Sequence, residues 1–125
     1  MSSLIIRAYF YLIRTDLYIR SGMFASLKKF TCRFAKLDYD RTHSSSIELI
    51  SHAVDLACVF YPKPVLCLQR SSTLVTLLRR AGIAADVIVG AQILPPRRHA
   101  WVECEGSVVN DKPYMRELYR ELDRF

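Results

Sequence analysis

Apolar residues recur at helical spacing through the first part of the chain. Residues 3–20 mix Leu, Ile, Tyr and Phe with arginines, and residues 23–37 place their apolar side chains on one stripe, with most of the basic residues off it. A third pattern opens at residues 45–48 (SSIE), which have the form of a capping box, and continues to about Phe60. Since apolar positions three and four apart form one face of a helix, these segments predict a layer of helices.

The pattern changes after Pro62 and Pro64, because neither residue can continue a helix. A new helical pattern over residues 66–80 is followed by Gly82, a residue that suits the end of a helix. Short runs rich in β-branched or aromatic residues predict strands over residues 86–93, 99–104 and 107–111, and the tail over residues 113–125 predicts a short helix. We therefore expect an α+β fold in which N-terminal helices and a central helix pack on a small antiparallel sheet.

Length and composition favour one folded domain over residues 1–125, with a helical part at 1–61 and a core that contains the sheet at 62–125. The longest uncharged apolar run near the start, residues 8–13, is far shorter than the about 20 residues of a membrane-spanning helix. Charged residues also interrupt the one candidate signal peptide. The net charge of +6 is compatible with an acidic partner or with solvated helix faces. We expect a soluble, cytoplasmic protein that binds neither nucleic acid nor membrane.

The cysteines do not form a metal-binding pattern. The chain has four, without a CxxC pair and without close spacing to histidine, which argues against a zinc site. In a reducing cytoplasm we expect them to be thiols. Asp38, Asp40 and His43 are an alternative metal site, which we interpret as an ordinary loop between helices. The sequence therefore predicts neither a metal nor a cofactor.

Three residues of the second part have the types and places that cysteine-protease chemistry needs. Cys67 stands at the start of the central helix, where the helix dipole and free N–H groups stabilise a thiolate. His99 opens a strand as a possible general base, and Asp111 closes the next strand as its orienting carboxylate, with Asn110 the weaker alternative. Each residue alone is more often structural. Together they have the chain order of papain-like and transglutaminase-like sites.

The loop between the last two predicted strands decides whether His99 faces Asp111. A two-residue turn, 105–106, puts the two side chains on opposite faces of the sheet, whereas a three-residue loop, 104–106, puts them directly across from each other. Three-residue loops favour a left-handed residue at their last position, where Gly106 stands. We therefore expect the three-residue loop.

The second part also contains two distinctive blocks, CLQRSSTLVTLLRRAGIAADVIVG at residues 67–90 and HAWVECEGSVVND at residues 99–111. These blocks resemble the lasso peptide B2 proteins, the leader peptidases of lasso peptide biosynthesis, which belong to the transglutaminase-like cysteine protease superfamily. The shared pattern is a Cys-Leu-x-Arg-Ser helix that ends in Leu-Leu-Arg-Arg-x-Gly-Ile. A strand ending in Gly and the sequence His-Ala-Trp-Val-Glu follow it.

The resemblance implies a transglutaminase-like core in which Cys67 is the nucleophile, His99 the base and acid, and Asp111 the orienting carboxylate. It implies that the protein removes the leader from a lasso peptide precursor. It also implies that a separate recognition protein, B1, binds the leader and that a separate ATP-dependent cyclase acts afterwards. Two alternatives stay open: another transglutaminase-like amidase or acyltransferase, and a non-catalytic scaffold that binds a peptide.

Overall fold

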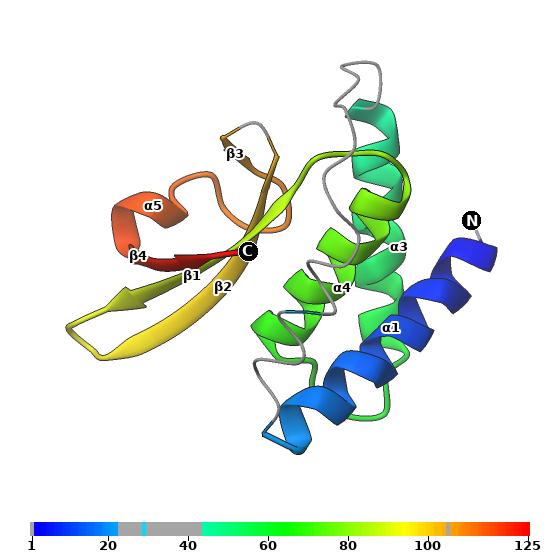
Figure 1. Cartoon of the computed structure of the whole chain (residues 1–125), viewed down its shortest axis with the longest axis horizontal. Helices are drawn as coiled ribbons and strands as arrows, with labels where there is room; N and C mark the ends of the chain where they lie inside the picture. Colours follow the sequence, from blue (N-terminus) through cyan, green and yellow to red (C-terminus); the bar gives the residue numbers. More distant parts are fainter. Residues whose placement is uncertain (1, 23–28, 30–43, 105) are drawn as a thin grey trace.

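The computed structural model describes residues 2–22, 29, 44–104 and 106–125. The helices are α1 (Ser2–Arg20), α3 (Ser44–Val59), α4 (Cys67–Arg80) and α5 (Met115–Leu118), and the strands are β1 (Asp86–Gln92), β2 (Arg97–Cys104), β3 (Ser107–Val108) and β4 (Arg120–Arg124). The strands form one antiparallel sheet in the order β3-β2-β1-β4. Figure 1 shows α1 and α3 on one side of α4 and the sheet on the other. The predicted α+β class is confirmed; the helix expected over residues 23–37 lies outside the described residues.

α4 is the central helix that the sequence predicted. Leu66 precedes it in an extended conformation, and Gly82 follows it with a φ of +82°. Residues 71–79 are all buried, although several are polar. The small side chains of Ser71, Ser72 and Thr73 let α1, α3 and the sheet approach α4 from different sides. Cys67 is therefore the first residue of α4, the helix on which α1, α3 and the sheet pack.

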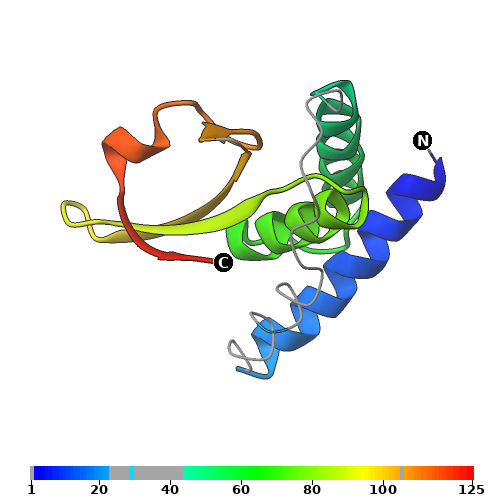
Figure 2. The same cartoon turned by 45° about the horizontal axis from the view of Figure 1, so that its top comes forward.

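The sheet is packed on both faces because its strands alternate their side chains. Val87, Ala100 and Val102 belong to the main core, which they share with the helices. Ile88 and Trp101 point to the other face and form a second, smaller core with Met115. The segment that carries α5 arches over one face of the sheet (Figure 2).

The helix predicted over residues 113–125 is wrong for most of its length. Only Met115–Leu118 is helical, and Arg120–Arg124 forms β4, which pairs with β1. Phe125 continues this pairing, with its N–H 2.9 Å from the oxygen of Val87 and its oxygen 2.6 Å from the Val87 N–H. The open edge of β1 offers the tail a full set of hydrogen-bond partners, and this non-local pairing outweighs the local preference for a helix.

The predicted three-residue hairpin loop is also wrong. Cys104 pairs with Ser107, and Glu103 pairs with Val108, so only residues 105 and 106 connect β2 to β3. Gly106 has a φ of +79°, a value that a two-residue hairpin turn accepts as readily as a longer loop. The strand expected over residues 107–111 ends at Val108.

Gly90 of β1 has no room for a side chain. A Cβ atom at this position would lie 2.7 Å from the Trp101 ring and 2.8 Å from the Cβ of Tyr119. Because Trp101 is fully buried, it cannot move aside easily. We expect Gly90→Ala to lower the free energy of unfolding by about 1–3 kcal/mol, measured by urea titration. Ala91→Val, one residue along the same strand, serves as the control, and equal stabilities for Gly90→Ala and the wild type would contradict this packing.

Candidate active site

His99 and Asp111 are in direct contact. Nε2 of His99 lies 2.5 Å from Oδ2 of Asp111, and each side chain is about one quarter exposed (26% and 24%). The backbone N–H of Lys112 donates to the other carboxylate oxygen at 2.8 Å. Burial acts to raise the pKa of Asp111, but the bonds from His99 and Lys112 outweigh it and hold that pKa below its ordinary value. Asp111 is therefore an ionised acceptor for the imidazole at neutral pH.

Asp111 contacts His99 although the two-residue turn between β2 and β3 was expected to keep the two side chains apart. In the observed register a regular strand would turn the two residues to opposite faces. The chain leaves the ladder first, because the Oδ1 of Asn110 accepts the backbone N–H of Val102 at 2.8 Å, and its Nδ2 donates to the Ser71 hydroxyl at 3.2 Å. Asn110 thus ties this segment to β2 and α4 and leaves Asp111 free to turn toward His99. Among the described residues, no hydrogen bond joins Asn110 to His99.

Two aromatic residues surround the imidazole of His99. Its ring centroid lies 5.4 Å from that of Tyr119 and 6.2 Å from that of Trp101, with interplanar angles of 30° and 27°. Trp101 is fully buried and belongs to the second, smaller core, beside which the imidazole lies. Sequence reasoning missed Tyr119, because the tail was predicted to be helical. Residues 120–124, RELDR, carry no local strand signal, so nothing in the sequence around Tyr119 could have placed it beside His99.

Cys67 and His99 line one pocket of about 300 Å³, together with Leu68, Val89, Arg98 and Ala100. Cys67 is half-buried and stands at the N-terminus of α4, where the backbone N–H groups of the first turn are free to bind an anion. Within the described part of the chain, no hydrogen bond joins Cys67 to His99. The structure therefore brings His99 and Asp111 together and places Cys67 on the wall of the same pocket, and the catalytic role of the three stays a prediction.

The start of α4 is fixed by Gln69, whose side chain is buried. Its Nε2 donates to the backbone oxygen of Leu12 in α1 at 2.9 Å, and its Oε1 accepts from the N–H of Leu66 at 3.4 Å. These bonds hold the residue before Cys67 and the first turn of α4 against α1. The position of the thiol is thus set by helix packing and by this amide.

The other described cysteines are less suited to nucleophilic chemistry. Burial raises the pKa of the Cys58 thiol, which disfavours the thiolate. Cys104 is buried in the main core, with 5% of its surface exposed. Cys32 lies outside the described residues, as does the alternative metal site of Asp38, Asp40 and His43.

The described residues contain neither a metal-binding cluster nor a membrane-spanning helix. No group of three or more His, Cys, Asp or Glu side chains has an arrangement that would hold a metal ion. No helix in that part of the chain has the length and apolar character needed to cross a bilayer.

Glu103 anchors the back of the site. Glu103 is 2% exposed, and its carboxylate accepts bonds from the indole Nε1 of Trp101 at 2.8 Å and the Nε of Arg116 at 2.9 Å. Arg124 of β4 lies 3.5 Å away. Burial acts to raise the pKa of Glu103, but the bonds from Arg116 and Trp101 dominate and lower it. The carboxylate thus joins β2 to the α5 segment and to β4.

A lowered pKa at Glu103 makes the stability of the fold depend on pH. The contribution of Glu103 is present above its ordinary pKa of 4.5 and is lost as the pH falls through the lower pKa of the folded state. As the pH falls below 4.5, we expect the melting temperature of the wild type to fall more steeply than that of Glu103→Gln, which should be less stable at neutral pH. Thermal unfolding followed by circular dichroism measures both slopes, and parallel slopes would contradict this role.

Comparison with known proteins identifies the family of the chain. A family model described as the transglutaminase-like superfamily matches residues 11–124. The Microcin J25-processing protein McjB of Escherichia coli is 39% identical over 51 residues. The matched segment is 41% of this chain and spans only 24% of that relative's length. No solved structure matches the chain.

Proposed function

Because the chain belongs to the transglutaminase-like superfamily, we propose that it is a cysteine peptidase that removes the leader segment from a lasso peptide precursor. The observation that carries the proposal is the contact of Asp111 with His99, which lines the same pocket as Cys67. The similarity to a microcin J25-processing protein supports the substrate class.

In the proposed mechanism His99 takes the proton of the Cys67 thiol, and the thiolate attacks the carbonyl carbon of the scissile peptide bond. The N–H groups at the start of α4 stabilise the oxyanion of the tetrahedral intermediate. Asp111 holds the imidazole ring and stabilises its protonated form. His99 then gives the proton to the leaving nitrogen, the C–N bond breaks, and the leader remains on Cys67 as a thioester.

Water completes the reaction. His99 removes a proton from a water molecule, which attacks the thioester carbonyl and releases the leader with a free carboxylate. The core peptide has already left with a free N-terminal amine, the group that a separate ATP-dependent cyclase then joins to an acidic side chain. If an amine attacked the thioester in place of that water, the leader would be transferred to the amine as an amide. The mass of the leader product therefore distinguishes hydrolysis from acyl transfer.

We further propose that a separate leader-binding protein, B1, presents the precursor to this site. We expect addition of that protein to raise the cleavage rate by about tenfold or more at low substrate concentration, because it increases the effective concentration of the precursor. Mass spectrometry of the two products, with and without the recognition protein, measures the rate and the gain of one water. The same assay with the Cys67→Ala protein is the control. Equal rates would exclude this partner, and an acylated amine as the product would exclude the peptidase.

A further inference from the structure

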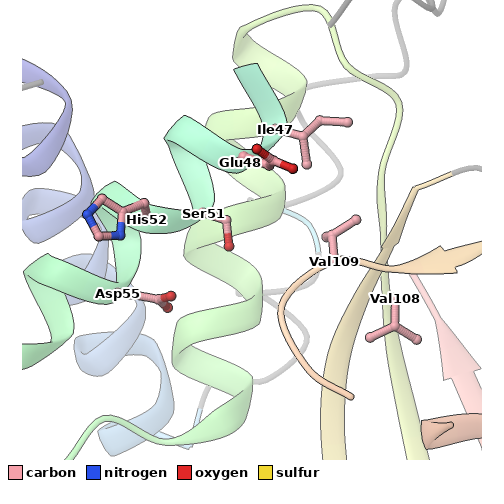
Figure 3. A pocket seen from close by; sticks show the side chains of 7 residues that line it. All are labelled: Ile47, Glu48, Ser51, His52, Asp55, Val108 and Val109. Carbon is pink, nitrogen blue, oxygen red and sulfur yellow. The ribbon is translucent and has the colours of Figure 1, made fainter. Parts of the chain in front are cut away.

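A groove runs between α3 and the β3 edge of the sheet (Figure 3). Its volume is about 450 Å³. The walls consist of Ile47, Glu48, Ser51, His52 and Asp55 on α3 and of Val108 and Val109 on the opposite side. Figure 3 shows Ile47 and Val109 turned toward each other, whereas the side chain of Val108 lies on the other side of its strand, against the second, smaller core.

The groove is acidic in a basic protein. The chain has a net charge of +6, yet the lining includes two carboxylates, one histidine, His52, and no lysine or arginine. Asp55 is already paired with Arg70 of α4, at 2.5 Å. Glu48 is exposed and makes no ion pair with another described residue. One carboxylate of the groove is therefore available to a cation from outside.

The strand wall of the groove also offers backbone hydrogen bonds. β3 is the last strand on its side of the sheet. The Val109 N–H bonds the oxygen of Val102 at 3.0 Å, which makes these two a hydrogen-bonded pair of the ladder. Such pairs alternate with non-bonded ones in an antiparallel ladder, so the N–H and C=O of Val108, opposite Glu103, point away from β2. An extended peptide can bond to an open edge of this kind.

The groove adjoins the candidate active site along two elements. The segment that begins with Val108 and Val109 continues to Asp111, which contacts His99. On α4, Arg70 reaches toward the groove to pair with Asp55 and lies one turn after Cys67. A peptide lying in the groove would therefore be close to the pocket of Cys67.

We propose that this groove binds an extended segment of the peptide substrate, with the substrate backbone bonded to Val108 and a basic side chain paired with Glu48. The inference rests on the proposed function, since it takes the substrate to be a peptide. It adds a preference for Lys or Arg at a position away from the scissile bond.

Binding is tested first, without turnover. Cys67→Ala protein is titrated with short fluorescent peptides of alternating Thr and Val that carry a central Lys or a central Gln. At low salt we expect the Lys peptide to bind about two- to fivefold more tightly, and Glu48→Lys in the Cys67→Ala protein to abolish that difference. Glu117→Lys, an exposed change on α5, is the matched control and should preserve it. Equal affinities for the two peptides, or no effect of Glu48→Lys, would overturn the proposal.

N-methylation tests strand addition separately. A Lys peptide with an N-methyl group on the residue that faces Val108 loses a backbone donor and should bind more weakly than the unmethylated peptide, and equal affinity at every methylated position would exclude pairing at this edge. Self-association of the chain that Glu48→Lys abolishes, with equal binding of the Lys and Gln peptides, would assign the groove to a second copy instead.

Cleavage assays separate this inference from the proposed function. Basic residues of the precursor are replaced one at a time by Gln, and kcat/KM is measured with wild-type and Glu48→Lys protein. If every precursor variant is cleaved equally well, the proposed preference for a basic residue would be excluded and the proposed peptidase function would stand. If the precursor is never cleaved but the Lys peptide still binds more tightly in a way that depends on Glu48, the proposed peptidase function would be excluded and the proposed peptide-binding groove would stand.

Discussion

The Cys67→Ala protein should fail to cleave the precursor, with a loss of at least about 10³-fold in kcat, while its thermal unfolding stays close to that of the wild type. The reason is that the thioester cannot form without the thiolate, and no later step can then occur. Cys67 is half-buried at a helix start, so replacing the thiol with a methyl group removes little packing. The measurement is the rate of leader release, followed by mass spectrometry in the presence of the recognition protein.

Single replacements of the other cysteines are the controls. Cys58→Ala and Cys32→Ala should keep activity, and Cys104→Ala should keep kcat even where burial of that residue makes the fold less stable. Residual cleavage by the Cys67→Ala protein, or a requirement for one of the other three, would show that the nucleophile is elsewhere.

Asp111→Asn should lower kcat by about 10²–10⁴-fold and leave KM nearly unchanged. An amide can still bond the imidazole, but it carries no charge to stabilise the protonated ring during the reaction. Since the pKa of Asp111 lies below its ordinary value of 3.8, its contribution to activity is present at neutral pH and is lost only as the pH falls through that lowered pKa.

Steady-state kinetics of Asp111→Asn at pH 7 should be compared with those of Glu117→Gln, an exposed carboxylate on α5. The control should behave like the wild type. If Asp111→Asn kept its full kcat, the contact with His99 would be structural only, and the orienting role would have to be assigned to another residue.

The features that sequence predicted correctly depend on local signals. Pro64 and Gly82 bracket the central helix, and the β-branched run over residues 86–93 predicted the strand that the structure shows as β1. These signals act over a few residues and do not depend on the rest of the fold. The start of α4 at Cys67 could therefore be located without a structure.

The features that sequence missed depend on partners far away in the chain. The proximity of His99 and Asp111 was expected from a three-residue loop that does not exist, because parity applies only while a strand stays regular. The Asn110 side chain ends that regularity by substituting for a backbone acceptor. The tail forms a strand because β1 offers it an open edge, and nothing within residues 113–125 reveals that edge.

The burial of α4 has a consequence for how the site would respond to warming. Local opening of a protein begins where few buried contacts and few backbone bonds hold a segment, and it reaches the enclosed elements last. Cys67 belongs to the most enclosed helix, whereas Asp111 follows an irregular segment that the two side-chain bonds of Asn110 tie down. Fluctuations should therefore part Asp111 from His99 well before they displace the thiol. Activity would then decline reversibly at temperatures where the helices and the sheet are still folded.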